Sequence, residues 1–200
     1  MEQAFGESGV AASLTWFHQS ILDLIQYAYQ PSDPAGPNYF NVAEARAQGL
    51  EVSLTAPLGD LFLSGGYTYL DSEVLDSGFD EGEGAVFVEG EALIRRPTHM
   101  GTLVAFYQLP RVVLSGDLRW TGARDDRDFS AWPAAPIALS SYALLGLGLE
   151  VDLLQSGEGR PGIDLRLRAE NLLDEEYQEI FGFTSPGRSF LVGLSVDFGG

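Results

Sequence analysis

The side chains that most often carry out chemistry are few and poorly grouped in this 200-residue sequence. The two histidines, His18 and His99, do not stand at a metal-ligand spacing from one another. Ser20 lies near His18, but a serine hydrolase also needs a polar group that orients the histidine. Cysteine is absent, which excludes disulfides and thiolate–metal sites. We therefore predict no enzyme activity, no metal site and no cofactor, and we expect both histidines to be structural or interfacial.

A second group of candidate residues is acidic. Residues 71–91 (DSEVLDSGFDEGEGAVFVEGE) hold eight carboxylates and no basic side chain. Carboxylates spaced among glycines can bind calcium, which takes about six to eight oxygen ligands. The spacing does not match an EF-hand loop, however. We favour a solvated acidic loop over a cation site, and a third interpretation is bridging by divalent cations to an anionic lipid surface.

Arginine and aromatic side chains mark two candidate ligand-binding loops. These residue types are favoured at binding hot spots. The first loop is 122–138 and the second is 174–188. The alternative interpretation is that the first loop forms internal Arg–Asp pairs, and that the aromatic residues of the second loop only hold that loop in place. The candidate substrate-binding residues are Arg124, Arg127 and Trp132 in the first loop, and Tyr177 and Phe181 in the second.

The elements that would position these loops are β-strands. Residues 162–173 read GIDLRLRAENLL, in which apolar and charged residues alternate with a period of two. This pattern is typical of a strand with one apolar and one polar face. We predict an all-β fold of about eight antiparallel strands, with residues 1–5 as the end of an earlier strand. The alternating stretches are 10–17, 50–56, 61–69, 100–106, 112–121, 145–153, 163–170 and 189–198.

The connections between these stretches alternate in length. Bacterial outer-membrane barrels have short periplasmic turns and long extracellular loops. If the last strand ends in the periplasm, every long connection here falls outside and every short one inside. We therefore predict an up-and-down transmembrane β-barrel segment, although periodicity alone leaves a soluble β-sandwich as an alternative. The short turns are 57–60, 108–111 and 155–162, and the long loops are roughly 26–41, 71–94, 122–138 and 174–188.

This topology assigns the two faces of the strands. An arginine that faces lipid near the bilayer midplane costs about 2–4 kcal/mol, so the charged face must point into the lumen. The predicted lumen-facing residues are Asp117, Arg119, Asp164, Arg166, Arg168 and Glu170. Aromatic belts lie at the level of the lipid headgroups. The predicted membrane-interface aromatics are Tyr67, Tyr69, Phe106, Trp120 and Phe198.

Composition bounds the remaining choices. Acidic residues number 29 against 11 basic ones, all arginine, and the net charge of −18 argues against a nucleic-acid partner. No apolar run approaches the roughly 18 residues that a membrane-spanning helix needs. No signal peptide is visible at the start of the sequence. We treat residues 1–200 as a single barrel domain.

Three stretches resemble TonB-dependent outer-membrane receptors, and they occur in the order that the family has. Residues 171–198 (NLLDEEYQEIFGFTSPGRSFLVGLSVDF) resemble the C-terminal end of the family's barrel. Residues 39–58 (YFNVAEARAQGLEVSLTAPL), followed by LSGGYTYLDSEV (63–74), resemble an earlier pair of strands. Residues 95–107 (RRPTHMGTLVAFY) resemble the family's Arg-Pro strand opening. The spacing of Tyr177, Gly182 and Gly187-Arg188 is most similar to the cobalamin receptors.

The resemblance implies a barrel of about 22 strands that is plugged by an N-terminal domain. It also implies uptake of a large scarce nutrient, such as cobalamin or a metal chelate, driven by an inner-membrane energy-coupling complex. The implied partners include outer-membrane lipid and the barrel-assembly machinery. Because the sequence shows no plug and no energy-coupling box, we expect the C-terminal part of such a barrel. The alternative is a self-contained small barrel with a structural or adhesion role.

Overall fold

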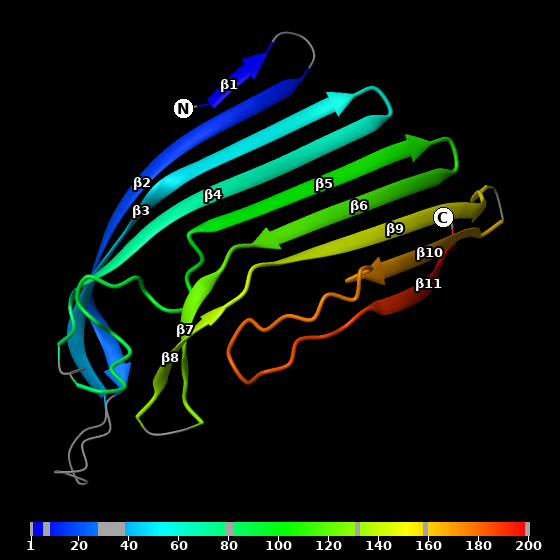
Figure 1. The fold of residues 1–200 in the computed structure, drawn as a ribbon. Helices are drawn as coiled ribbons and strands as arrows, with labels where there is room; N and C mark the ends of the chain where they lie inside the picture. The colour runs from blue at the N-terminus through cyan, green and yellow to red at the C-terminus, as the bar shows by residue number, and fades with distance from the viewer. Residues whose placement is uncertain are drawn as a thin grey trace.

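The structure, a computed structural model, describes residues 2–5, 9–27, 39–78, 82–130, 133–157 and 160–198. Every regular element within these ranges is a β-strand. Nine strands form one sheet, and β7 and β8 form a separate two-stranded hairpin (Figure 1). The sheet strands are β1 (Glu2–Phe5), β2 (Val10–Tyr27), β3 (Tyr39–Leu58), β4 (Leu61–Asp76), β5 (His99–Leu109), β6 (Val112–Thr121), β9 (Tyr142–Leu154), β10 (Gly162–Glu170) and β11 (Ser189–Asp197). The hairpin strands are β7 (Arg124–Asp128) and β8 (Ala135–Leu139).

The sheet follows the chain from one edge to the other. Its order is β1-β2-β3-β4-β5-β6-β9-β10-β11, and all neighbours are antiparallel. This confirms the predicted all-β, up-and-down arrangement, and the pairing of β1 with β2 confirms that residues 2–5 belong to an earlier strand. Within the described residues the sheet remains open, because β1 and β11 stand at its two edges and do not pair.

Tight turns join the strands at one end of the sheet. Leu58 pairs with Leu61, so Gly59 and Asp60 make a two-residue turn. Gly59 has a φ of 63°, the left-handed conformation that such turns need and glycine adopts without strain. Leu109 pairs with Val112 around a second two-residue turn. We call this end the short-turn end and the opposite end, which carries the longer connections, the long-loop end (Figure 1).

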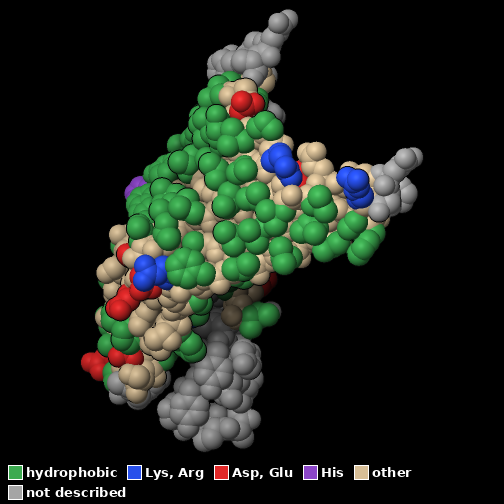
Figure 2. Space-filling view, turned by 90° about the vertical axis from the view of Figure 1, so that its right-hand side faces the viewer, with side chains coloured by type: hydrophobic (Ala, Val, Ile, Leu, Met, Phe, Trp, Pro, Cys, Tyr) green, Lys and Arg blue, Asp and Glu red, His purple; other side chains and the backbone are tan. Residues whose placement is uncertain are grey.

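The register separates an apolar face from a polar face. Leu118 pairs with Leu103 and Leu145 on the first, while Asp117 pairs with Val104 and Gly146 on the second. The apolar face is exposed: Leu118, Leu147 and Val192 are 39%, 45% and 73% exposed. Figure 2 shows hydrophobic side chains over a broad part of the surface. An exposed apolar surface of this extent is typical of a protein that meets a membrane or a partner.

Two segments have features that the sequence pattern did not indicate. Phe106 lies on the polar face, because β5 pairs it with Phe62 and Ser115. Both sets of alternate residues in β5 are largely apolar, so the sequence pattern did not determine which set shares the face of Leu103. Residues 122–138 also form more than a loop, because most of them lie in the β7–β8 hairpin.

The strands fall into a long group and a short group. β2, β3 and β4 have 18, 20 and 16 residues, whereas β10 and β11 have nine each. A membrane-spanning strand needs only about 9–11 residues. The long group therefore continues well past that length at the long-loop end. β2 and β3 take up only the two ends, 26–27 and 39–41, of the stretch predicted as the first long loop, and residues 28–38 lie outside the described residues. The start of the acidic stretch, 71–76, also belongs to β4.

Candidate functional site

Three segments that are distant in sequence meet at the long-loop end around the carboxylate of Asp126. They are the connection 82–98, the β7–β8 hairpin and the connection 171–188, and we call them together the loop cluster. The side chain of Asp126 has no solvent exposure. Its Oδ1 accepts hydrogen bonds from Arg95 Nε and the backbone N–H of Arg127, each at 2.8 Å. Its Oδ2 accepts one from the backbone N–H of Phe181, also at 2.8 Å.

These donors keep Asp126 ionised although it is buried. Burial by itself raises the pKa of a carboxyl group, because it removes water from the charged form. At Asp126 the N–H groups of Phe181 and Arg127, followed by the guanidinium of Arg95, outweigh burial and lower the pKa below its usual value. The carboxylate is therefore a charged, fully partnered centre for the three segments.

Arg124 and Tyr142 fasten the connection 171–188 a second time. Arg124 is buried, donates from Nη2 to the carbonyl of Gln178 at 2.5 Å, and lies over the Tyr142 ring at 5.4 Å. Tyr142 packs on Tyr177 with ring centroids 4.4 Å apart. Its hydroxyl donates to Glu179 at 3.3 Å. Because Tyr142 pairs with Thr121 on the polar face, the connection 171–188 lies on that side of the sheet.

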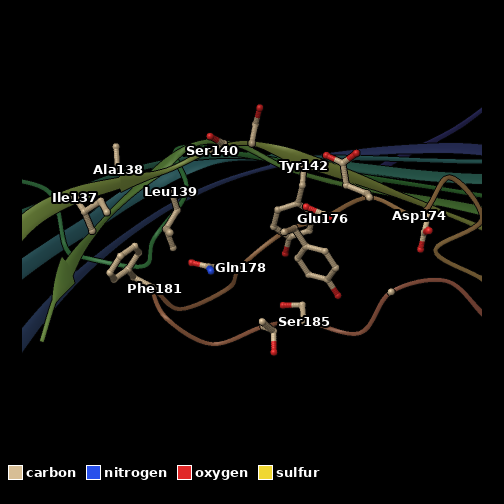
Figure 3. A pocket seen from close by; sticks show the side chains of 15 residues that line it. Ile137, Ala138, Leu139, Ser140, Tyr142, Asp174, Glu176, Gln178, Phe181 and Ser185 are labelled. Carbon is tan, nitrogen blue, oxygen red and sulfur yellow. The ribbon is translucent and has the colours of Figure 1, made fainter. Parts of the chain in front are cut away.

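A pocket of about 700 Å³ opens between this connection and the β8–β9 segment. Figure 3 shows Leu139 and Tyr142 pointing toward Gln178 and Ser185 on the opposite side. The pocket combines aromatic rings with hydroxyl, amide and carboxylate groups. This chemistry suits a polar, partly aromatic ligand. Six of the lining residues are Tyr142, Glu176, Tyr177, Gln178, Phe181 and Ser185.

Charged side chains cross the polar face of β6, β9 and β10 in pairs. Arg168 on β10 reaches Asp117 on β6 at 2.6 Å, across the intervening strand β9. Gly146 on β9 makes room for this pair, since a Cβ there would stand 2.5 Å from Asp117 Oδ1 and 2.7 Å from Arg168 Nη2. Arg166 pairs with Glu150 at 3.0 Å. The polar wall is therefore bound together by side chains as well as by its backbone ladder.

Aromatic side chains gather on the apolar face toward the long-loop end. Tyr67 and Tyr69 of β4 both contact His99 of β5, and the Tyr67 hydroxyl lies 2.7 Å from His99 Nδ1. His99 also stacks near Trp120 of β6, with ring centroids 6.4 Å apart. Trp16 continues the row on β2, because the register aligns it with Leu50, Tyr69 and His99 in turn. These five residues, from β2, β4, β5 and β6, form one aromatic belt, with Leu50 of β3 between Trp16 and Tyr69.

A family model described as TonB-dependent receptor-like, beta-barrel, matches residues 3–172. The chain belongs to this TonB-dependent receptor barrel family. Its barrels lie in the outer membrane of Gram-negative bacteria, so the family match confirms the predicted resemblance and the outer-membrane location.

Solved structures of TonB-dependent receptors show the same fold. The pyoverdine receptor FpvA of Pseudomonas aeruginosa PAO1 matches with a TM-score of 0.74 and 15% identity, over 98% of this chain and 28% of that one. The FrpB iron transporter of Neisseria meningitidis matches with a TM-score of 0.70 and 14% identity, over 92% and 28%. BauA, the ferric preacinetobactin receptor of Acinetobacter baumannii, matches with 0.67 and 20%, over 94% and 27%. The chain thus spans about a quarter of the length of these receptors.

The candidate residues predicted from sequence have different surroundings in this receptor barrel. All four of the described candidates lie in the loop cluster: Arg124, Tyr177 and Phe181 are on the side of the connection 171–188, and Arg127 is buried and pairs with Glu91 of the connection 82–98 at 3.6 Å. Trp132 lies outside the described residues. The six predicted lumen-facing residues share the polar face. Tyr67, Tyr69 and Trp120 share the apolar face, and Phe198 follows the end of β11 with 79% of its surface exposed. The roles of these residues in binding ligand or lipid stay predictions.

Sequence reasoning missed Asp126 and Arg95 as the centre of the cluster. The signal available for Asp126 was the alternation in RDDRD (124–128), which places Arg124 and Asp126 on one side of a strand and Asp125 and Arg127 on the other. His99 was also missed as a member of the aromatic belt. Across the described ranges, no three His, Asp or Glu side chains group closely enough to hold a metal ion. The same ranges contain no helix that is long and apolar enough to cross a membrane.

Proposed function

We propose that this protein is part of an outer-membrane receptor that imports a large scarce nutrient, a ferric siderophore or a similar metal chelate. The observation that carries the proposal is one antiparallel sheet with an apolar face, a charged face and a folded loop cluster at one rim. The matched structures include a pyoverdine receptor, an iron transporter and a ferric preacinetobactin receptor. Cobalamin, suggested by the spacing around Tyr177, is the competing substrate.

The chain then supplies the C-terminal part of a larger barrel wall. Its sheet is open at β1 and β11, and lipid cannot satisfy unpaired backbone groups at such edges. Further strands of the barrel would pair with both. The open sheet also argues against the self-contained small barrel with an anchoring or adhesive role. Outer-membrane lipid, the assembly machinery and an inner-membrane energy-coupling complex are the proposed partners of the whole receptor.

The two faces take opposite environments in this proposal. The apolar face with Leu118, Leu147 and Val192 meets lipid, and its aromatic belt lies at the outer headgroups. The polar face with Asp117 and Arg168 lines the lumen. The loop cluster, attached on the polar side, then lies over the external mouth of the barrel and presents its pocket to incoming ligand.

Uptake by cells that lack the gene tests the substrate. Deletion should abolish accumulation of radioactive iron supplied on one class of siderophore, and a protonophore should abolish the same uptake in the parent strain. Cobalamin labelled with radioactive cobalt separates the two candidate substrates: the deletion strain should still take it up if the substrate is a ferric siderophore. Loss of cobalamin uptake alone would favour the competing substrate, and unchanged uptake of both would overturn the proposed function.

The isolated chain gives a second test. An open sheet of nine strands should not form a closed transport path. Liposomes that contain only these 200 residues should therefore neither swell in small sugars nor take up labelled cobalamin. Swelling would show that the chain forms a pore by itself, contrary to its proposed place in a larger wall.

A further inference from the structure

The connection 171–188 bonds to the backbone of β9 at its start, where the N–H of Leu172 donates to the carbonyl of Leu145, and the rest of it is organised by its own side chains. Asn171 holds its start, because Asn171 Oδ1 accepts from the N–H of Glu175 and its Nδ2 donates to the carbonyl of the same residue, both at 2.9 Å. Asp174 closes its base, because Asp174 Oδ1 accepts from the N–H of Arg188 at 2.9 Å. The connection is therefore organised by its own hydrogen bonds, and its position relative to the sheet depends on its contacts with other segments.

Asp126 holds the middle of the connection. Phe181 stands near the middle of the connection, and its N–H donates to Asp126 Oδ2. The other oxygen of Asp126 is bound to Arg95 and to the N–H of Arg127. One carboxylate thus joins the connection 171–188 to the hairpin and, through Arg95, to the connection 82–98. Because the side chain is fully buried, water cannot replace any of these bonds while the cluster stays closed.

We propose that Asp126 is the positioning residue that holds the connection 171–188 against the β7–β8 hairpin, so that the pocket between them exists before ligand arrives. Arg124 and Tyr142 support the same contact through Gln178, Glu179 and Tyr177. The connection then acts as a fixed wall of the pocket and does not have to close over a ligand. The use of this pocket by the imported nutrient rests on the proposed function, but the role of Asp126 does not.

The geometry supplies a selective substitution. Asp126→Asn replaces one carboxylate oxygen by an amide nitrogen that donates and cannot accept. The remaining oxygen still accepts from both Arg95 and Arg127 if it takes the place of Oδ1. The amide nitrogen then faces the N–H of Phe181, and neither of these two groups can accept a hydrogen bond. The variant should therefore release the connection 171–188 and leave the bond to Arg95 in place. Asp125→Asn is the matched control, because Asp125 is the neighbouring exposed carboxylate on the other side of the same strand.

Single cysteines can report this release, since these 200 residues contain no cysteine. Ser185→Cys places a thiol in the pocket lining, and Ser77→Cys places one near the end of β4, away from the Asp126 contacts. The rate of labelling by a membrane-impermeant maleimide is measured on intact cells that carry the protein in the outer membrane. Asp126→Asn should speed labelling at position 185 by roughly tenfold or more, the factor expected when one hydrogen bond to a charged group is lost.

The controls separate positioning from a general loss of folding. Labelling at position 77 should stay unchanged in Asp126→Asn, and labelling at position 185 should stay unchanged in Asp125→Asn. Equal labelling rates at position 185 in the two variants would overturn the proposal, whatever nutrient the receptor imports. If Asp126→Asn fails to assemble, hydrogen exchange in the unmodified protein decides: the amide of Phe181 should be protected as well as strand amides, and rapid exchange would overturn the proposal.

Discussion

The barrel wall and the loop cluster satisfy their backbone polar groups in different ways. In the wall, the backbone of each strand bonds to the next strand, and side chains add ion pairs to this ladder and determine which face meets which surroundings. In the loop cluster the connection 171–188 forms no strand ladder, so buried side chains take over: Asp126 accepts from the N–H of Phe181, and Asn171 binds both backbone groups of Glu175. Buried backbone groups need partners in either case. The wall therefore depends on many weak, repeated contacts, whereas the cluster depends on a few irreplaceable residues.

This difference predicts how each region responds to substitution. In the wall, the effect of a substitution should depend more on which face of the sheet carries the residue than on which residue type stands there. In the cluster, one atom of one side chain should matter more than the face on which it lies.

The largest effect should come from placing charge on the apolar face of the wall. Leu165 pairs with Val151 and Leu194 on that face, whereas the adjacent Arg166 lies on the polar face and pairs with Glu150. Leu165→Arg should destabilise the membrane-inserted state by about 2–4 kcal/mol. Arg166→Leu removes a half-exposed ion pair and should cost no more than about 1 kcal/mol. Heat-modifiable gel mobility of refolded protein measures assembly, and equal damage from both changes would contradict the assignment of the faces.

A smaller effect should follow from filling the space beneath an ion pair of the polar wall. A methyl group at Gly146 would displace both Asp117 and Arg168, whereas one at Gly193 on β11 would meet nothing closer than Arg166 Cβ at 3.9 Å. We expect Gly146→Ala to lower the free energy of unfolding by about 1–3 kcal/mol, as overpacking commonly does. Gly193→Ala should change it little. Urea titrations of the two variants in the same lipid would test this, and a larger loss at Gly193 would contradict the observed packing.

The pH dependence should distinguish the cluster from the wall. The pKa of Asp126 is lower in the folded protein than its ordinary value of about 3.9, so the folded state binds this proton less readily than the unfolded state. Its contribution to stability is therefore complete above about pH 4–5 and is lost as the pH falls through the lowered pKa. The difference in urea midpoint between the unmodified protein and Asp126→Asn should narrow as the pH falls through this range. A constant difference would contradict an ionised Asp126.

The smallest perturbation tests orientation alone. Cysteines at Ser77 and Ser130 lie at the long-loop end and should react with an impermeant thiol reagent on intact cells. A cysteine at Asp60, in the β3–β4 turn, should react only after the cells are opened. Asp60 is preferable to Gly59 in this turn, because the positive φ of Gly59 disfavours any side chain. Labelling at position 60 with none at positions 77 and 130 would invert the topology.

The wall was largely predictable from sequence, and the cluster was not. Alternation in β10 is unambiguous, because Asp164, Arg166 and Arg168 cannot share a face with Leu165 and Leu167 at low cost. In β5 the two sets of residues differ little in polarity, so the face of Phe106 became clear only from its pairing with Phe62 and Ser115. Nothing in the local sequence could show that Arg95, Asp126 and Phe181 meet, because that contact depends on how three connections fold over one another.

The unequal strand lengths have a consequence for what approaches the cell from outside. At roughly 3.3 Å per residue, β2 and β3 contain about 60 Å of extended chain, against about 30 Å in β10 and β11. The part of the rim that these strands form is therefore uneven, high at β2 and β3 and low at β10 and β11. A large particle such as an antibody or a phage tail should contact the longer strands β2 and β3 first. Small solutes should enter on the side of the shorter strands β10 and β11, where the pocket of the loop cluster lies.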